Sequence, residues 1–194
     1  MRYRVARALS AALLVAAATL TGCTVTVPGT AVLATGQPIV VENLSADTYG
    51  KLSADTLTDA AGDWHSHGVD LYGIRYRQWD SRRGDTPPLC QHSSYRYPAF
   101  CADGWMAWDH AWVSTAAGKN SLIPRMYFAS AVARAVAFTA WGDDRPAVRT
   151  VACLSGAYLS GVNKSDFPVI RTYGQDIVAY ARGMASTDPL NDCR

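Results

Sequence analysis

The stretch 123-IPRMYFASAVARAVAFTAW-141 decides the fold of this 194-residue chain. It is the longest apolar segment after the N-terminal one, and it is rich in alanine, the strongest helix former. Pro124 suits the first turn of a helix, and Gly142-Asp143-Asp144 supplies a stop. Because a helix that is apolar on nearly all sides must be covered on nearly all sides, we expect a central helix with the rest of the domain packed around it.

Weaker patterns predict the elements that cover this helix. With Ser53 as the N-cap, apolar residues at i, i+3, i+4 and i+7 indicate an amphipathic helix ending near Gly68; they are Leu57, Ala60, Ala61 and Trp64. The other predicted elements are strands over 69–79 and 104–109 and helices over about 145–162 and 174–184. The sum is an α+β domain with more helix than strand.

The N-terminal segment predicts export and a lipid anchor. Three arginines (Arg2, Arg4 and Arg7) precede an apolar run over 8–20, which is short for a membrane span. Leu20-Thr21-Gly22-Cys23 then resembles the lipobox of bacterial lipoproteins, in which the cysteine is acylated and becomes the new N-terminus. The alternative is an ordinary cleaved signal followed by a chance cysteine.

These features predict three parts of the chain. They are a signal peptide over 1–22, a tether over 23–43 that is rich in Thr, Val, Pro and Gly, and a domain over 44–194 on the outer face of the cell membrane. Loss of the three signal arginines brings the formal charge from +2 to nearly neutral, so we expect membrane attachment by lipid and no nucleic-acid partner.

The remaining cysteines fit an oxidising compartment. Four cysteines allow three pairings, of which we favour Cys90–Cys101 and Cys153–Cys193, because the first pair flanks a short, turn-prone segment. Four reduced thiols are the alternative. A zinc cluster is less favoured, because no Cys-x-x-Cys spacing occurs.

Several motifs occur in order along residues 46–162. They are Thr86-Pro87-Pro88-x-Cys90, Tyr97-x-x-Phe100-Cys101-x-Asp103, Trp108-Asp109, the long central helix and Ala152-Cys153-Leu154-Ser155-Gly156. Together they resemble a bacterial family of neutral zinc metallopeptidases. In that family a cysteine-linked loop leads into a strand, a helix carrying His-Glu-x-x-His follows, and a later helix supplies the carboxylate that completes the metal site. The resemblance implies a zincin-like metallopeptidase-type domain with a small sheet and a central helix.

The residues at the family's metal site argue against its activity. The two histidine positions hold Arg134 and Phe138, the general-base position holds Ala135, and the later carboxylate positions hold Val148 and Ala152. Zinc hydrolysis needs three nitrogen, oxygen or sulfur ligands and a base for the bound water. Arginine stays protonated and the other four side chains have no donor atom. We therefore expect no catalytic residue, no metal and no cofactor at this degenerate site.

Arg134 is the residue most open to a binding role. A buried arginine needs a partner, which is either a structural aspartate such as Asp103 or Asp109, or the carboxylate of a ligand, for example a peptide C-terminus. Nearby aromatic residues either pack in the core or line a ligand cleft; they are Tyr95, Tyr97, Trp105, Trp108 and Trp112. Trp105 and Trp108 are the aromatic candidates for ligand binding.

The sequence thus predicts a non-catalytic cell-surface lipoprotein that binds a peptide, a glycan or an envelope protein. The first alternative is an active zinc metallopeptidase with ligands outside the family pattern, for which His65 and His67 are the candidates. These two histidines point about 200° apart on a regular helix, so they converge only where the helix frays. His110 is expected to pack against Trp112. The second alternative is a purely structural lipoprotein with a closed cleft.

Overall fold

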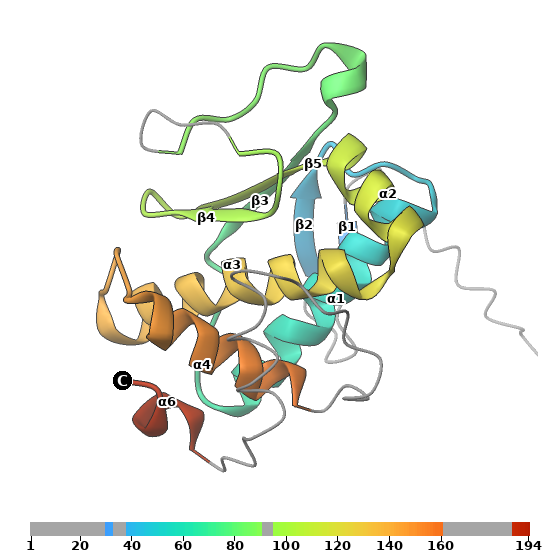
Figure 1. Cartoon of the computed structure of the whole chain (residues 1–194). Coiled ribbons are helices and arrows are strands. Elements are labelled where there is room, and N and C mark those ends of the chain that lie inside the picture. The colour runs from blue at the N-terminus through green and yellow to red at the C-terminus, as the bar shows by residue number, and fades with distance from the viewer. Residues whose placement is uncertain (1–29, 33–37, 91–94, 161–187) are drawn as a thin grey trace, which may run out of the picture.

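The computed structural model describes residues 30–32, 38–90, 95–160 and 188–194 (Figure 1). The predicted signal peptide, Cys23 and the helix predicted over 174–184 lie outside these ranges. The described chain is a mixed α+β structure, as predicted, with a small sheet beside a group of helices. Of the helices in these ranges, none has both the length and the apolar character that a bilayer crossing demands.

The sheet has five strands in the order β1-β2-β3-β5-β4. They are β1 (Thr30–Val32), β2 (Pro38–Glu42), β3 (Arg75–Trp79), β4 (Ala99–Cys101) and β5 (Trp105–Asp109). The three middle strands are parallel, whereas each edge strand runs antiparallel to its neighbour. β4, whose last residue is Cys101, therefore forms one edge of the described sheet.

Two predictions about strands need correction. The strand predicted over 69–79 begins only at Arg75, because Asp70–Ile74 form a turn in which the Asp70 carboxylate accepts from the Tyr72 N–H. Pro38–Glu42, assigned to the tether, pair with β1 and β3 as strand β2. Ile39 and Val41 are buried in the core, which explains why this segment belongs to the sheet.

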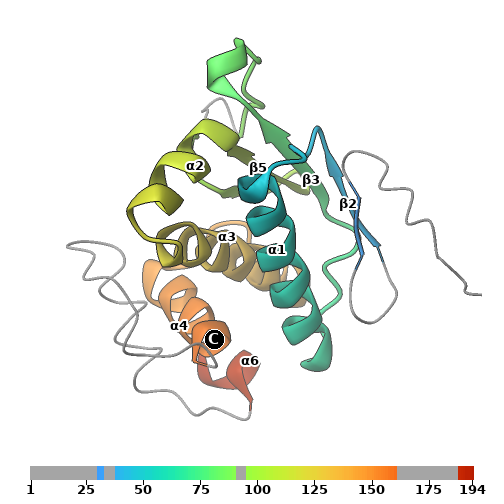
Figure 2. The ribbon, with the colours of Figure 1, turned by 90° about the vertical axis from the view of Figure 1, so that its right-hand side faces the viewer.

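The helices stack on one side of the sheet, with α3 in the middle (Figure 2). They are α1 (Thr48–Ser66), α2 (His110–Lys119), α3 (Leu122–Trp141), α4 (Val148–Leu159) and the short α6 (Pro189–Asp192); a 3₁₀ turn, η1, covers Ser81–Arg83. α3 packs against α1, α2, α4 and β4. The predicted central helix is therefore confirmed.

The core explains why α3 tolerates so few polar residues. Its buried side chains include Phe128, whose ring meets Trp108 of β5 edge-on at 5.2 Å, and a run of alanines that lets neighbouring helices approach closely. The helix ends at Gly142, whose φ of 68° is a left-handed conformation that favours glycine. The following turn sends the chain back as α4.

Two other helix predictions differ from the structure. α1 begins after Asp47 rather than Ser53, because the Asp47 carboxylate accepts from the backbone N–H groups of Tyr49 and Gly50. Ser53 lies within the helix and donates to the Tyr49 carbonyl. α2 was not predicted at all: Asp109 ends β5 and caps this helix by accepting from the Ala111 N–H.

Both predicted cysteine pairs lie at disulfide distance. The Cα atoms are 5.1 Å apart for Cys90–Cys101 and 5.5 Å apart for Cys153–Cys193. The first bridge joins Cys90 to Cys101, the last residue of β4, and the second ties the C-terminal segment to α4. The predicted pairing is confirmed.

Candidate functional site

A cleft of about 680 Å³ opens between β4, one face of α3 and the start of α4. Its size falls in the range of small-molecule and peptide sites. Its lining residues are Cys90, Tyr95, Tyr97, Pro98, Ala99, Phe100, Cys101, Ala102, Tyr127, Ser130, Ala131, Arg134, Asp144, Arg145, Pro146 and Val148. Most of these side chains are apolar or aromatic, and the charged ones gather at one end.

The three sides of the cleft follow from the local structure. Tyr127, Ala131 and Arg134 recur every three or four residues on α3, so they form a stripe along one face of that helix. β4 and its flanking residues form the opposite wall, held in place by the Cys90–Cys101 bridge. The connection from α3 to α4 closes the end near Arg134.

Arg134 lines this cleft and is half-buried. Among the described residues its guanidinium has no hydrogen-bond or ion-pair partner. The expected ion pair with Asp103 or Asp109 is therefore not formed. The Asp109 carboxylate instead accepts from Ser81 and from the Ala111 N–H, and Asp103 is exposed.

The five positions that the resemblance assigns to a former metal site divide into two groups in the structure. Arg134 of α3 and Val148 of α4 both line the cleft, so helix packing brings these two positions to one place. Ala135 and Ala152 are buried, and the Phe138 ring packs against Phe100 of β4 at 5.5 Å. Within the described ranges, no three His, Cys, Asp or Glu side chains converge as a metal site requires.

The tryptophans proposed as ligand-binding residues do not line the cleft. Trp108 is fully buried against Phe128 in the core. Trp105 is half-buried, and the Arg75 guanidinium lies 3.9 Å from its ring centroid. These positions correct the sequence prediction for both residues.

Tyrosines supply the aromatic surface of the cleft instead. The Tyr97 ring lies 5.5 Å from both Tyr95 and Tyr127, and Tyr127 packs on Trp112 at 4.8 Å. Tyr95 and Tyr97 are 38% and 42% exposed. Tyr127 was missed from the sequence, although its spacing of seven residues from Arg134 places both on one face of a helix.

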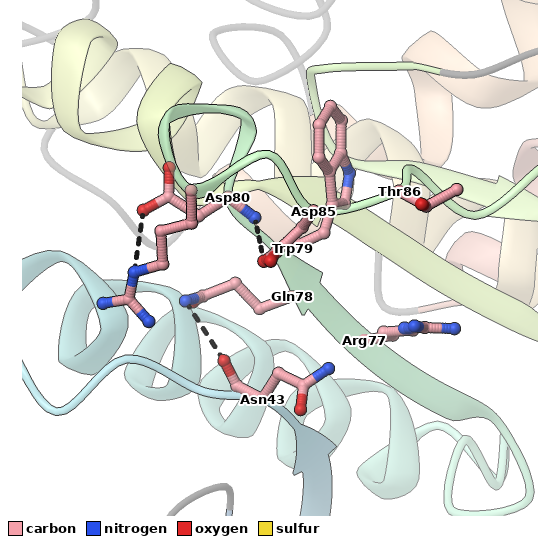
Figure 3. Close-up of a pocket in the computed structure, with 8 residues that line it drawn as sticks. Asn43, Arg77, Gln78, Trp79, Asp80, Asp85 and Thr86 are labelled. Atoms are coloured by element: carbon pink, nitrogen blue, oxygen red, sulfur yellow. Dashed lines mark hydrogen bonds and ion pairs between the residues drawn. The ribbon is translucent and has the colours of Figure 1, made fainter.

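A second, smaller pocket of about 380 Å³ lies at the carboxyl ends of β2 and β3 (Figure 3). Some of its polar groups bond to one another: Gln78 Nε2 donates to the Asn43 carbonyl at 3.4 Å, the Asp80 N–H donates to Asp85, and Arg83 Nε lies 3.7 Å from Asp80. Gln78 Oε1 and Trp79 Nε1, in contrast, are buried and have no hydrogen-bond partner among the described residues. A hydrogen bond from Arg82 is the main reason that the pKa of Asp80 is lowered. The Asp80 carboxylate also accepts from the Arg82 backbone N–H, so this side chain stabilises the start of the η1 turn.

The three histidines in the described part of the chain do not form a shared site. His65 packs against Tyr72 and His67 packs against Trp64, each with ring centroids 5.7 Å apart, so the two rings have different neighbours. His110 does not pack against Trp112 as predicted. It is buried, its Nε2 lies 2.8 Å from Asp47 Oδ2, and its ring meets the edge of Tyr49.

Comparison of the chain with protein-family models, curated proteins and solved structures yields no match. The chemistry of the cleft therefore comes from its own residues. A guanidinium that has no partner among the described residues, in a cleft that also has an aromatic surface, suits binding of an anionic group that is attached to an apolar body.

Proposed function

We propose that this chain is a non-catalytic, lipid-anchored surface protein whose zincin-like metallopeptidase-type domain binds a ligand carboxylate at Arg134. The observation that carries the proposal is the half-buried Arg134 guanidinium, which lines the cleft and has no partner among the described residues. Removing an arginine partly from water has a cost that a bound carboxylate offsets through paired, charge-assisted hydrogen bonds.

The location of Arg134 supports the link to the metallopeptidase family. In the resemblance, the first metal histidine and a carboxylate from the later helix fall at Arg134 and Val148, and in the structure both positions line one cleft. That convergence is what a fold descended from a two-helix metal site requires. At this point a positive charge replaces the positive metal ion, so the site retains an attraction for anions without a means to activate water.

The experiment is a titration of the purified full chain with N-acetyl-alanyl-alanine and, separately, with its C-terminal amide. The Arg134 Nε–Hε signal in a ¹H–¹⁵N spectrum reports the binding. We expect the acid to shift this signal and the amide to leave it unchanged, because only the acid offers a carboxylate to the guanidinium. Equal shifts with both compounds, or none with the acid, would contradict the proposal.

Arg125 provides a matched control on the same helix. It is also half-buried, it does not line the cleft, and its nine-residue separation from Arg134 places it on the opposite side of α3. Because Arg134→Gln removes the side-chain signal itself, the backbone N–H signals of Ala131 and Arg145, which line the cleft, report the response of the variants. The acid should leave these signals unchanged in Arg134→Gln and should shift them in Arg125→Gln. Loss of binding in both variants would mean a general charge effect and would argue against a specific site.

A further inference from the structure

We infer that the ligand of this cleft is the C-terminal tail of a polypeptide, bound with its terminal carboxylate at Arg134 and an aromatic side chain, about three residues upstream, against the tyrosines. The inference rests on the proposed function and adds the class and direction of the ligand. It draws on the two ends of the cleft, which differ in chemistry, and on the distance between them.

The aromatic end is formed by three rings from two parts of the chain. Tyr95 and Tyr97 precede β4, Tyr127 belongs to α3, and the Tyr97 ring lies 5.5 Å from each of the others. Their tilts of 46° and 48° leave the rings angled rather than stacked flat. An aromatic side chain of a ligand can pack on such rings edge-on or offset, the arrangements that aromatic pairs prefer.

The cationic end holds two arginines. Arg134 is half-buried, Arg145 is exposed, and neither side chain has an ion-pair partner among the described residues. Asp144 lines the same end, so the charge there amounts to a single net positive unit. One excess positive charge matches a single carboxylate better than a polyanion such as a nucleic acid or a phosphorylated glycan.

The spacing sets where the two parts of the ligand must lie. Seven residues of helix separate Tyr127 from Arg134, which is about 10 Å at 1.5 Å per residue. An extended peptide rises about 3.3 Å per residue, so the same distance spans roughly three residues. A carboxylate at Arg134 therefore places the side chain of the residue three positions upstream next to the tyrosines.

The walls between the two ends also favour a peptide. Ala99 and Ala131 line the cleft and present small apolar surfaces, and Pro146 adds another at the end near Arg134. Small lining side chains leave room for a peptide main chain with small side chains of its own. They also provide few polar groups to bond with the many hydroxyls of a sugar. The complete ligand is thus a short C-terminal segment with one large apolar anchor.

The experiment measures fluorescence polarisation of labelled peptides with the purified full chain. The probe is fluorescein-Gly-Gly-Phe-Ala-Ala-Ala with a free C-terminus; the comparison peptides carry a C-terminal amide, or the phenylalanine moved to the last position. We expect the probe to bind at least tenfold more tightly than either comparison peptide. Tyr95→Ala should weaken binding of the probe but not of an all-alanine acid, and Tyr72→Ala, which removes a tyrosine outside the cleft, serves as the control.

The outcomes separate this inference from the proposed function. If all free-acid peptides bind equally and Tyr95→Ala has no effect, the carboxylate site stands and the aromatic anchor is wrong. If the amide binds as well as the acid, or Arg134→Gln leaves the affinity unchanged, the proposed function fails as well. If no peptide binds and chitotetraose does, without dependence on Arg134, the cleft takes a glycan and the inference is overturned.

Discussion

Asp47 connects two distant parts of the fold, and its replacement should measurably lower the free energy of unfolding. One carboxylate oxygen caps α1 by accepting from the N–H groups of Tyr49 and Gly50, at 3.0 and 2.9 Å. The other oxygen lies 2.8 Å from His110 Nε2 at the start of α2. The His110 side chain is only 2% exposed, whereas the Asp47 side chain is 48% exposed.

The loss of folding stability expected for Asp47→Ala is the sum of two lost interactions, the helix cap and the hydrogen bond to His110. Loss of an N-cap costs about 1 kcal/mol. His110 would then be buried with neither ring nitrogen bonded, because Nδ1 already has no partner among the described residues, and an unsatisfied buried group costs about 1–3 kcal/mol. The sum, about 2–4 kcal/mol, is a large share of the roughly 5–15 kcal/mol that stabilises a domain. Asp47→Asn keeps one acceptor for the cap and places its NH2 group, a donor, beside His110 Nε2, which accepts in one of its neutral tautomers, so its cost should stay below about 1 kcal/mol.

Urea denaturation of the wild type and both variants measures these differences. The wild type should be the most stable, followed by Asp47→Asn and then Asp47→Ala. The dependence of the free energy of unfolding on urea concentration should be the same for all three. An Asp47→Ala variant within about 0.5 kcal/mol of the wild type would refute the reasoning, since that is the range of ordinary surface substitutions.

The pH dependence gives a second check on the same residue. Burial alone would raise the pKa of Asp47, but hydrogen bonds from the Gly50 N–H and from His110 outweigh it and lower this pKa below its usual value. A carboxyl group with a lowered folded-state pKa adds stability above its unfolded pKa of about 4 and loses it as pH falls through the folded value. The stability advantage of the wild type over Asp47→Asn should therefore be full near neutral pH and shrink below about pH 4.

Three further predictions concern the disulfide, the anchor and the degenerate site. Replacing Cys153 and Cys193 together by alanine should lower the free energy of unfolding by about 4 kcal/mol, because the bridge links residues 40 positions apart in the sequence. An unchanged midpoint of urea denaturation would contradict this prediction. Cys23→Ser should abolish acylation and release the protein from the membrane fraction into the aqueous phase of a detergent partition, and retention in the detergent phase would exclude Cys23 as the anchor. Ala135→Glu introduces a glutamate at the position where the resemblance implies a general base, and it should bring no chelator-sensitive casein cleavage. Because Ala135 is fully buried, the substitution should lower the free energy of unfolding by several kcal/mol. A stable variant that cleaves casein would contradict both expectations.

The central helix was predictable from sequence because its signal is local and strong. An alanine-rich apolar run with a proline at its start and Gly142 at its end admits few alternatives, and the structure places it at Leu122–Trp141. The start of α1 was not predictable in the same way, since Ser53 and Asp47 both qualify as caps and the choice depends on His110, 63 residues away. α2 was missed because Asp109 serves both as the last residue of β5 and as a helix cap.

The candidate site was also predictable only in part: sequence motifs indicate some of its residues, whereas others depend on contacts between distant segments. The motif resemblance singles out Arg134 and Val148 as candidate positions, and the packing of α3 on α4 brings both to one cleft. The choice of aromatic residues was wrong, because composition cannot show which face of β5 meets the core, and Trp108 turned out to face Phe128. Tyr127 contributes to the cleft only because the loop before β4 folds back over α3, a contact between segments about 30 residues apart.

Metal analysis of the purified full chain is the most direct test of the claim that Arg134 has replaced the metal site. The protein is dialysed against zinc, desalted and analysed for bound metal, with Arg134→His as the comparison variant. The account predicts far less than one zinc per chain for both proteins, because two of the nearest family positions, Phe138 and Val148, still lack donor atoms. Stoichiometric zinc in the wild type, removed by a chelator together with any peptidase activity, would contradict the account and support the alternative that the protein is an active zinc metallopeptidase.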